Sequence, residues 1–358
     1  MRKRPFMAGV AAALTLAPAV ALAAILAAIL AVGSAQACGF HGYTPQPSLV
    51  DRLLASDQVV LARASALNPF RYEAVAVLAG GRGAVDIPDL VDTATRRRLA
   101  REPAAVLFAR TGAYSRWQRL AYVDAAFHPI LAQILSRLPA WDGGDADDRL
   151  TFFAGLLPHP DPAIHRLALK ELDKADYGPL RRLELAVPAA RVAARLDRVA
   201  EADLKPIRVL LLGLTEDPSL VPYFKARVRA NAGAGSAVLG AYATALIETE
   251  GAQAVGWITH DILTDAAVPL DSKELLVEAM AIHAAAGAPA TAAAVAAAMQ
   301  EALRQDASLA PAVARQFGQR ADWSLEVPLS DLLRRRALSS PSDILVVTHY
   351  VALAGQTR

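Results

Sequence analysis

The sequence predicts a mainly α-helical protein with a small β domain ahead of the helices and a hydrophobic segment at its N-terminus. Apolar residues recur with a helical period from about residue 149 onward, and residues 58–123 contain short β-prone runs separated by glycine and proline. Residues 7–32 carry no charge. A chain of 358 residues exceeds the usual size of one hydrophobic core, so two folded domains are expected after the N-terminal segment.

The N-terminal segment has the order of features found in export signals. Basic residues at positions 2–4 precede the uncharged run, which is followed by the small-residue pattern Ala35-Gln36-Ala37. This order predicts a signal peptide cleaved between Ala37 and Cys38. The apolar run is also long enough to span a bilayer at ~20 residues, so an uncleaved membrane anchor is the alternative. Both interpretations export the rest of the chain, which is then periplasmic or membrane-anchored and faces away from the cytoplasm.

Cys38 is the only cysteine and directly follows the predicted cleavage site. In this position it resembles the lipidated cysteine of bacterial lipoproteins, although Ala35 and Gln36 differ from the residues that those proteins prefer before it. It is otherwise a free or intermolecularly paired thiol, or a residue without a role. One cysteine excludes an intrachain disulfide, so folding must depend on packed cores.

Residues 38–140 are expected to form the small β-containing domain. A short helix over 48–55 precedes five β-prone runs, which lie at 58–64, 71–78, 84–87, 104–110 and 117–123. Short strands bounded by glycine and proline are typical of small barrels or curled sheets, so we predict a β-barrel-like domain.

The order of these elements resembles bacterial netrin-like domains and the domains of tissue inhibitors of metalloproteinases. Those domains open with a cysteine, followed by a short helix, a strand like Gln58–Ala64, and a strand like Tyr72–Leu78 that ends before a glycine. The further cysteines of that family are absent here. The resemblance implies that only Cys38 could chelate a protease metal, through its amine and carbonyl groups.

The second domain is predicted at 149–358, after a polar linker at 141–148 that contains four aspartates. The linker lacks the spacing of an EF-hand loop, so a solvated connection is expected rather than a calcium site. About ten to twelve helices of roughly 10 to 15 residues, joined by short turns, then predict an irregular α-solenoid. Asp161-Pro162 and Asp217-Pro218 are predicted helix starts, with aspartate as the N-cap and proline in the first turn.

Residues 157–169 resemble the turn and helix of a HEAT repeat. The two Asp-Pro pairs, at 161 and 217, are 56 positions apart, which is longer than the ~40 to 47 residues of HEAT and armadillo repeats. Degenerate HEAT-like helix pairs are therefore expected. The resemblance implies a long concave face that binds other proteins.

The sequence contains no motif for catalysis or metal binding. Its seven histidines form no H-x-x-x-H pair, and the stretch at 231–235 lacks the Gly-Lys-Ser/Thr ending of a phosphate loop. Ser236 is not in a G-x-S-x-G elbow and is instead expected to cap a helix. We therefore assign no catalytic, cofactor-binding or metal-ligating residue and expect no cofactor. The alternative is an envelope hydrolase with scattered carboxylates, which two buried carboxylates facing one pocket would indicate.

The charge balance argues against nucleic acid as a partner. The net charge is +2, and without the first 37 residues 34 basic residues face 35 acidic ones. The arginine runs at 96–98 and 334–336 are expected to lie on solvated helix faces. By elimination, we predict a non-catalytic scaffold of the cell envelope. Its expected partners are an unknown envelope protein and the membrane, which it contacts through the N-terminal segment or a lipid on Cys38.

The candidate interface consists of aromatic and basic residues in the helical region, because Tyr, Trp and Arg are enriched at interface hot spots. These residues are Tyr223, Arg227, Arg229, Trp257 and Trp323. A lone Trp or Tyr on a helix is also a common core residue, so the alternative role for the aromatic residues is packing.

Overall fold

A computed structural model describes residues 45–81, 85–100, 104–112 and 114–357. All of them belong to one compact unit, which spans Ala37–Arg358. Ala37 and Cys38 lie outside the described residues, so cleavage, anchoring and lipidation stay predictions. Within the described ranges, no helix is long and apolar enough to cross a bilayer. Helices make up 61% of the structure, which confirms the prediction of a mainly helical protein.

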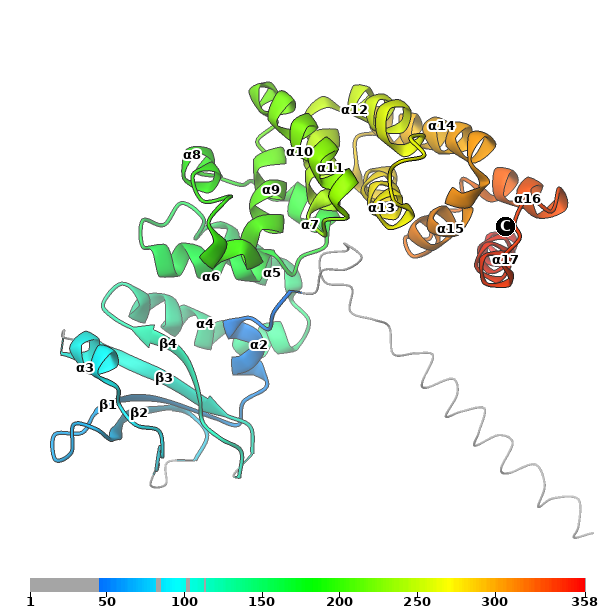
Figure 1. The fold of residues 1–358 in the computed structure, drawn as a ribbon. Helices are drawn as coiled ribbons and strands as arrows, with labels where there is room; N and C mark the ends of the chain where they lie inside the picture. The colour runs from blue at the N-terminus through cyan, green and yellow to red at the C-terminus, as the bar shows by residue number, and fades with distance from the viewer. Residues whose placement is uncertain (1–44, 82–84, 101–103, 113, 358) are drawn as a thin grey trace, which may run out of the picture. The chain divides into compact units, whose positions relative to one another are not determined.

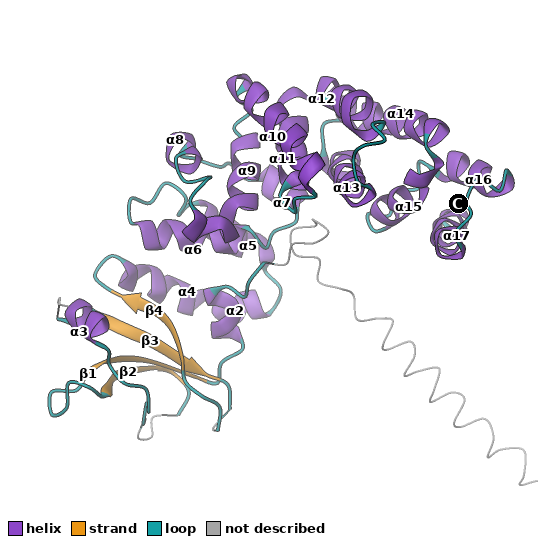
Figure 2. Cartoon of the chain, in the orientation of Figure 1, coloured by secondary structure: helices purple, strands orange, loops and turns teal. Residues whose placement is uncertain are grey.

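Residues 58–123 form an open antiparallel sheet, not the predicted barrel (Figure 2). The strands are β1 (Gln58–Ala64), β2 (Tyr72–Ala79), β3 (Ala105–Arg110) and β4 (Gln118–Val123), in the order β2-β1-β3-β4. The two outer strands, β2 and β4, do not pair with each other, so the sheet does not close. The prediction of a strand at 84–87 is wrong for the described residues 85–87, which form a loop.

Both faces of the central strands β1 and β3 are covered, whereas β2 carries exposed residues such as Val75. One face packs on α2 (Leu49–Leu54) and α4 (Phe127–Asp142), and the other packs on α3 (Thr93–Leu99) and its preceding loop. Alternate residues of β1 enter the two cores, Val59 and Leu61 on one side and Val60 and Ala62 on the other. Strands buried on both faces have continuous apolar runs, and helices occupy the space that further strands would need to close a barrel.

The helical region begins with α5 (Ala146–Ala154), α6 (Pro162–Leu172), α7 (Tyr177–Arg182), α8 (Ala189–Ala193) and the 3₁₀ helix η1 (Val199–Leu204). The predicted start of α6 is confirmed, since Asp161 accepts hydrogen bonds from the backbone N–H groups of Ala163 at 2.7 Å and Ile164 at 3.2 Å. Its Pro162 occupies the first turn, where no backbone N–H is needed.

From residue 205 onward the helices pack in two rows (Figure 1). The first row contains α9 (Lys205–Gly213), α11 (Leu239–Glu250), α13 (Leu270–Ala286), α15 (Ala310–Gly318) and α17 (Pro341–Gln356). The second row contains α10 (Val221–Ala234), α12 (Ala252–Ile258), α14 (Pro289–Gln305) and α16 (Glu326–Arg334). Short turns of 3₁₀ or π type complete the connections: η2 (Pro218–Leu220), η3 (Thr259–Leu263) and η4 (Ala307–Leu309). This arrangement is compatible with a helical repeat.

The separation of 56 positions between the two Asp-Pro pairs is not the length of one repeat. Helices of the first row begin at residues 205, 239, 270, 310 and 341, so the repeat is 31 to 40 residues long. Asp161 caps α6, whereas Asp217 caps η2 ahead of α10, so the two pairs start elements that are not equivalent. Ser236 does not cap a helix, because α11 begins only after Val238.

The interior contains two large hydrophobic cores. One lies within the two rows of helices. The other extends from α2, α4 and one face of the sheet to α5, α6 and α9. This second core includes Trp141, which is 6% exposed and lies in the segment predicted as a linker. The turn between α4 and α5 is short, since α4 ends at Asp142 and α5 begins at Ala146.

Candidate protein-binding surface on α10 and α12

The side chains of α10 lie in lines along the helix, because residues four positions apart share a face. The buried line packs into the core of the array and consists of Phe224, Val228 and Ala232. Two further lines flank it on opposite sides. They consist of Tyr223 with Arg227, and of Lys225 with Arg229.

On the first side, Arg227 contacts both an aromatic ring and a carboxylate. Its guanidinium lies 5.2 Å from the ring centroid of Tyr223, and its Nη2 atom is 3.1 Å from Asp197. The hydroxyl of Tyr223 is 3.3 Å from that of Tyr242 on α11. Burial raises the pKa of Tyr242, and the hydrogen bond with Tyr223 raises it further. The Arg227 charge is thus already compensated within the chain.

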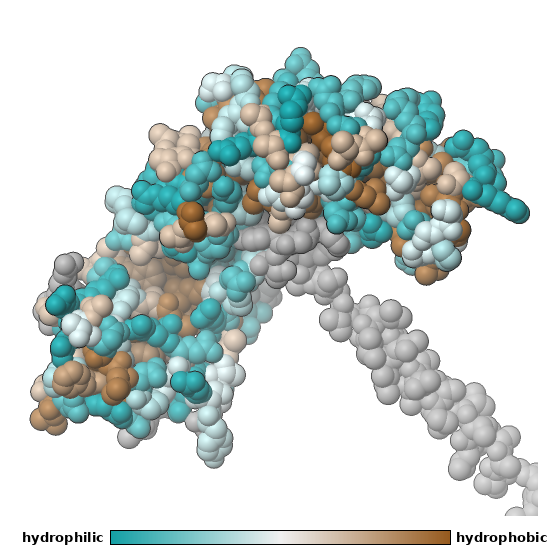
Figure 3. All heavy atoms as spheres, viewed as in Figure 1, coloured by the Kyte–Doolittle hydropathy of each residue, from teal (hydrophilic) through white to brown (hydrophobic). Residues whose placement is uncertain are grey.

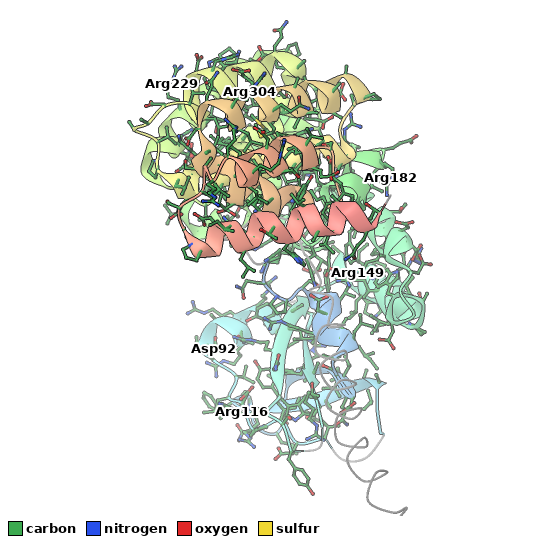
Figure 4. The ribbon with its side chains drawn as sticks, turned by 90° about the vertical axis from the view of Figure 1, so that its right-hand side faces the viewer. Asp92, Arg116, Arg149, Arg182, Arg229 and Arg304 are labelled. Atoms are coloured by element: carbon green, nitrogen blue, oxygen red, sulfur yellow. The ribbon has the colours of Figure 1, made fainter. Side chains whose placement is uncertain are left out.

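On the second side, two cations share one indole ring. The ammonium group of Lys225 lies 5.6 Å from the ring centroid of Trp257, and the guanidinium of Arg229 lies 5.4 Å from it. Lys225 also forms an ion pair with Glu250 at 2.8 Å. Arg229 is exposed and has no carboxylate partner in the part of the chain that the structure describes (Figure 4).

Trp257 gives this side its rigidity. It packs against the core of the helical array while two cations lie over its ring. Each cation–π contact contributes about 0.5–1 kcal/mol at an exposed site. The Arg229 guanidinium thus lies over the ring with no carboxylate partner among the described residues, where an anionic group of a partner can reach it.

Trp323, the fifth predicted interface residue, lies elsewhere. It precedes α16 and packs on Tyr350 of α17, with ring centroids 5.0 Å apart. Both residues line a cavity of about 570 Å³ between α15 and α17. The structure thus brings four of the five predicted residues onto α10 and α12 and separates Trp323 from them.

The sequence reasoning missed Lys225 and the two carboxylates, Asp197 and Glu250, that contact this surface. A signal for Lys225 was present, because it stands four residues before Arg229 and therefore shares its helix face. The carboxylates gave no comparable signal, because their contacts with α10 depend on how separate helices pack.

Two carboxylates between packed helices, Glu248 and Glu274, are engaged by arginines. Glu248 of α11, whose side chain is 3% exposed, accepts hydrogen bonds from Arg181 and from the Tyr177 hydroxyl, each at 2.8 Å. Glu274 of α13 accepts two from Arg315 of α15, at 2.8 and 2.7 Å. These pairs join α7 to α11 and α13 to α15, so their geometry is that of contacts between packed helices.

His283 of α13 is buried beside Glu248. Its Nε2 atom lies 3.0 Å from the backbone carbonyl of Thr244, to which it donates, and its Nδ1 atom is 3.8 Å from the Glu248 carboxylate. Burial lowers the pKa of His283, although the carboxylate and the carbonyl act in the opposite direction. The imidazole is therefore neutral at pH 7.

Two carboxylates, Asp89 and Asp92, line one cavity of about 240 Å³ near α3. Asp92 is the N-cap of α3, and its oxygens accept hydrogen bonds from the Thr95 backbone N–H and hydroxyl, both at 2.8 Å. These hydrogen bonds lower the pKa of Asp92, whereas a carboxylic acid that serves as general acid needs a raised pKa. Among the described residues, no three of His, Cys, Asp and Glu are grouped so that they could hold a metal ion.

These observations define the protein as a two-row helical array that follows a small open sheet, with a cation-bearing aromatic surface on its second row. Comparison of the chain with protein-family models, with curated proteins and with solved structures finds no match. The likeness to HEAT repeats and to netrin-like domains therefore depends on the sequence pattern alone.

Proposed function

We propose that the protein is an exported scaffold of the cell envelope that binds another protein through the α10–α12 surface. This surface consists of Lys225, Arg229 and Trp257, and Tyr223 with Arg227 lies on the opposite side of α10. The observation that carries the proposal is the exposed guanidinium of Arg229, which lies over Trp257 without a carboxylate partner among the described residues. An aspartate or glutamate of a partner would form a charge-assisted hydrogen bond with it beside an aromatic anchor.

The two-row packing supports this role. The buried line of α10 holds the helix in the array, so the residues beside that line are fixed in place. In helical repeats each unit contacts mainly its neighbours, and residues facing solvent contribute little to the fold. Export, which the proposal includes, is supported by the basic start, the apolar run and the Ala35-Gln36-Ala37 pattern.

The hydrolase alternative has weaker support. A glycosidase-like mechanism needs two carboxylates facing one substrate site, one of them with a raised pKa. Glu248 and Glu274 are engaged by arginines between packed helices. Asp92, which does line a cavity, has a lowered pKa and caps a helix. No observation favours this alternative over binding.

The test is partner capture with a matched pair of variants. The chain from Ala37 onward is immobilised and incubated with envelope extract, and captured proteins are identified by mass spectrometry. Arg229→Glu is compared with Arg304→Glu, which reverses a charge that is 68% exposed on α14, also in the second row. We expect Arg229→Glu to weaken capture of a specific partner by about tenfold or more, because like charges across an interface repel.

The control variant decides the interpretation. Arg304→Glu should retain capture, and both variants should keep the melting temperature of the unmodified chain. Equal losses in the two variants would mean that capture follows net charge alone. Equal capture by Arg229→Glu and the unmodified chain would contradict the α10–α12 surface as the binding site.

A further inference from the structure

The loop between β1 and β2 carries apolar side chains that are not packed. Leu67 is 97% exposed and Phe70 is 56% exposed. Leu90, in the loop before α3, is 67% exposed and lies next to them, since the N–H of Val91 donates to the Phe70 carbonyl at 2.9 Å. Figure 3 shows hydrophobic atoms gathered at this end of the sheet. We call Leu67, Phe70 and Leu90 the apolar tip.

Helix α3 carries three consecutive arginines, of which Arg96 faces the apolar tip, Arg97 is exposed, and Arg98 lies 4.0 Å from the ring centroid of Tyr122 on β4. The guanidinium of Arg96 lies 5.0 Å from the ring centroid of Phe70, which places α3 directly against the tip. None of the three has a carboxylate partner among the residues that the structure describes, whereas the nearby Asp86 and Asp92 face other arginines. The described residues between 58 and 123 include eight arginines and four acidic residues, so this region has a positive net charge.

We infer that the apolar tip, together with Arg96 and Arg97 of α3, forms a docking surface for an anionic phospholipid bilayer. Exposed apolar side chains enter the boundary between headgroups and acyl chains, while adjacent arginines bind lipid phosphates. An anionic bilayer presents phosphates and hydrocarbon side by side across its whole area, so it satisfies both kinds of side chain together. A protein partner would have to match the same residues one by one.

This surface is separate from α10–α12 and does not require the N-terminal segment or a lipid on Cys38. We therefore expect a chain that lacks both the N-terminal segment and a lipid on Cys38 to bind anionic bilayers. The exposed side chain of Leu67 and the charges of Arg96 and Arg97, which have no carboxylate partner among the described residues, are the two components to vary, because none of these side chains is buried in a core.

The experiment uses the chain from Ala37 onward with Cys38→Ser and measures its flotation with lipid vesicles. We expect binding to vesicles of phosphatidylcholine that contain about 30% phosphatidylglycerol, because the anionic headgroups give the surface a negative potential. We expect little binding to vesicles of phosphatidylcholine alone. Arg96→Ala with Arg97→Ala should weaken binding about 25-fold, at about fivefold for each arginine. Leu67→Asp should weaken vesicle binding about tenfold, because an aspartate does not partition into hydrocarbon and is repelled by anionic headgroups.

Val199→Asp is the matched control for Leu67→Asp, since Val199 is 90% exposed and lies in η1 of the helical region. It should bind vesicles like the unmodified chain. Equal flotation with both vesicle types, or none with either, would overturn the proposal. So would loss of binding in the arginine variant with none in Leu67→Asp, because that result describes adsorption by charge alone. Binding to a DNA duplex in place of anionic vesicles would assign the arginines to nucleic acid instead.

Discussion

Arg149 of α5 donates a hydrogen bond to Asp51 of α2, a residue 98 positions earlier in the chain, over 3.0 Å (Figure 4). The same guanidinium also contacts Glu171 of α6, whose side chain is 1% exposed. Asp51 receives a second contact from Lys174. The helices that follow the sheet are thus joined to the helix that precedes it by one network of charges.

We predict that Arg149→Ala lowers the free energy of unfolding by about 3–5 kcal/mol, because it removes the ion-pair partner of the buried Glu171 carboxylate, which keeps a hydrogen bond from the Val50 backbone N–H. Urea unfolding followed by circular dichroism measures the loss. Arg166→Ala is the control: Arg166 pairs with Asp203 at 3.2 Å, both about 40% exposed, and its removal should cost less than about 1 kcal/mol. Similar losses in both variants would show that the Arg149 network has no special role.

Stability should fall as the pH drops below about 6.5, the ordinary pKa of histidine, because His283 has a lowered pKa in the fold. The unfolded chain then binds a proton that the folded chain does not, so protonation favours unfolding. His283→Gln keeps a donor for the Thr244 carbonyl and should flatten this dependence between about pH 5 and 7. His349→Gln, at an exposed position, should leave it unchanged. A steep slope that persists in His283→Gln would assign the dependence to other groups, such as the buried His165.

Asp51 should contribute stability that is lost at lower pH than the contribution of His283. Burial opposes ionisation of this carboxyl, but hydrogen bonds from Lys174, the Ser48 backbone and Arg149 outweigh burial and lower its pKa from 3.8 to about 2. Its contribution is therefore complete above about pH 4 and is lost as the pH falls toward 2. In acid titrations followed by circular dichroism, the stability of the Asp51→Asn variant should fall less steeply between about pH 4 and 2 than that of the unmodified chain. An equally steep loss of stability below about pH 4 in Asp51→Asn would contradict the role of Asp51.

The double variant Arg227→Glu with Arg229→Glu should leave the melting temperature nearly unchanged and abolish partner capture. Among the described residues, the double variant removes one exposed ion pair, between Arg227 and Asp197, and the two exposed cation–π contacts with Tyr223 and Trp257. Such exposed contacts contribute about 0–1 kcal/mol each. Differential scanning fluorimetry and the capture assay measure the two effects. A melting temperature that falls by more than a few degrees would mean that these residues stabilise the array, and undiminished capture would contradict their role in binding.

The fragment 149–358 is predicted to be more than half helical without the sheet. Its helices have their own caps and cores, as Asp161 and the packing of the two rows illustrate. The core shared with α2 and α4 adds a second expectation, because the fragment exposes part of it and should unfold at lower urea than the chain from Ala37 onward. Circular dichroism tests both statements. A disordered or strand-rich spectrum would contradict a domain boundary at 141–148.

The sequence was informative where local rules decide the structure. A helical period with an Asp-Pro start located α6, because the N-cap and the first-turn proline depend on adjacent residues. The sequence analysis grouped Arg227 with Arg229, although two residues turn a helix by about 200° and the structure places the two side chains on opposite sides of α10. Four of the five strands were located by their apolar runs.

Features that depend on packing between distant segments were not accessible from the sequence. The barrel prediction is wrong because nothing local to β1 or β3 shows that helices cover both faces of the sheet. The contact between Arg149 and Asp51 joins residues that no pattern links. Leu67 and Phe70 were overlooked because an apolar residue is expected inside, and only the structure shows that they are exposed.

The ion pair between Glu248 and Arg181 also decides among alternative packings of the array. Helices rich in alanine and leucine have nearly uniform surfaces, so several alignments of neighbouring helices have similar free energies. A slip of α11 by one turn, about 5.4 Å, would separate Glu248 from Arg181 and leave a charge alone among apolar side chains. That isolation costs about 3–5 kcal/mol and falls only on the misaligned chain. We therefore expect the pair to favour the native alignment over alignments shifted by one turn, even though a buried ion pair adds little to the stability of the native state itself.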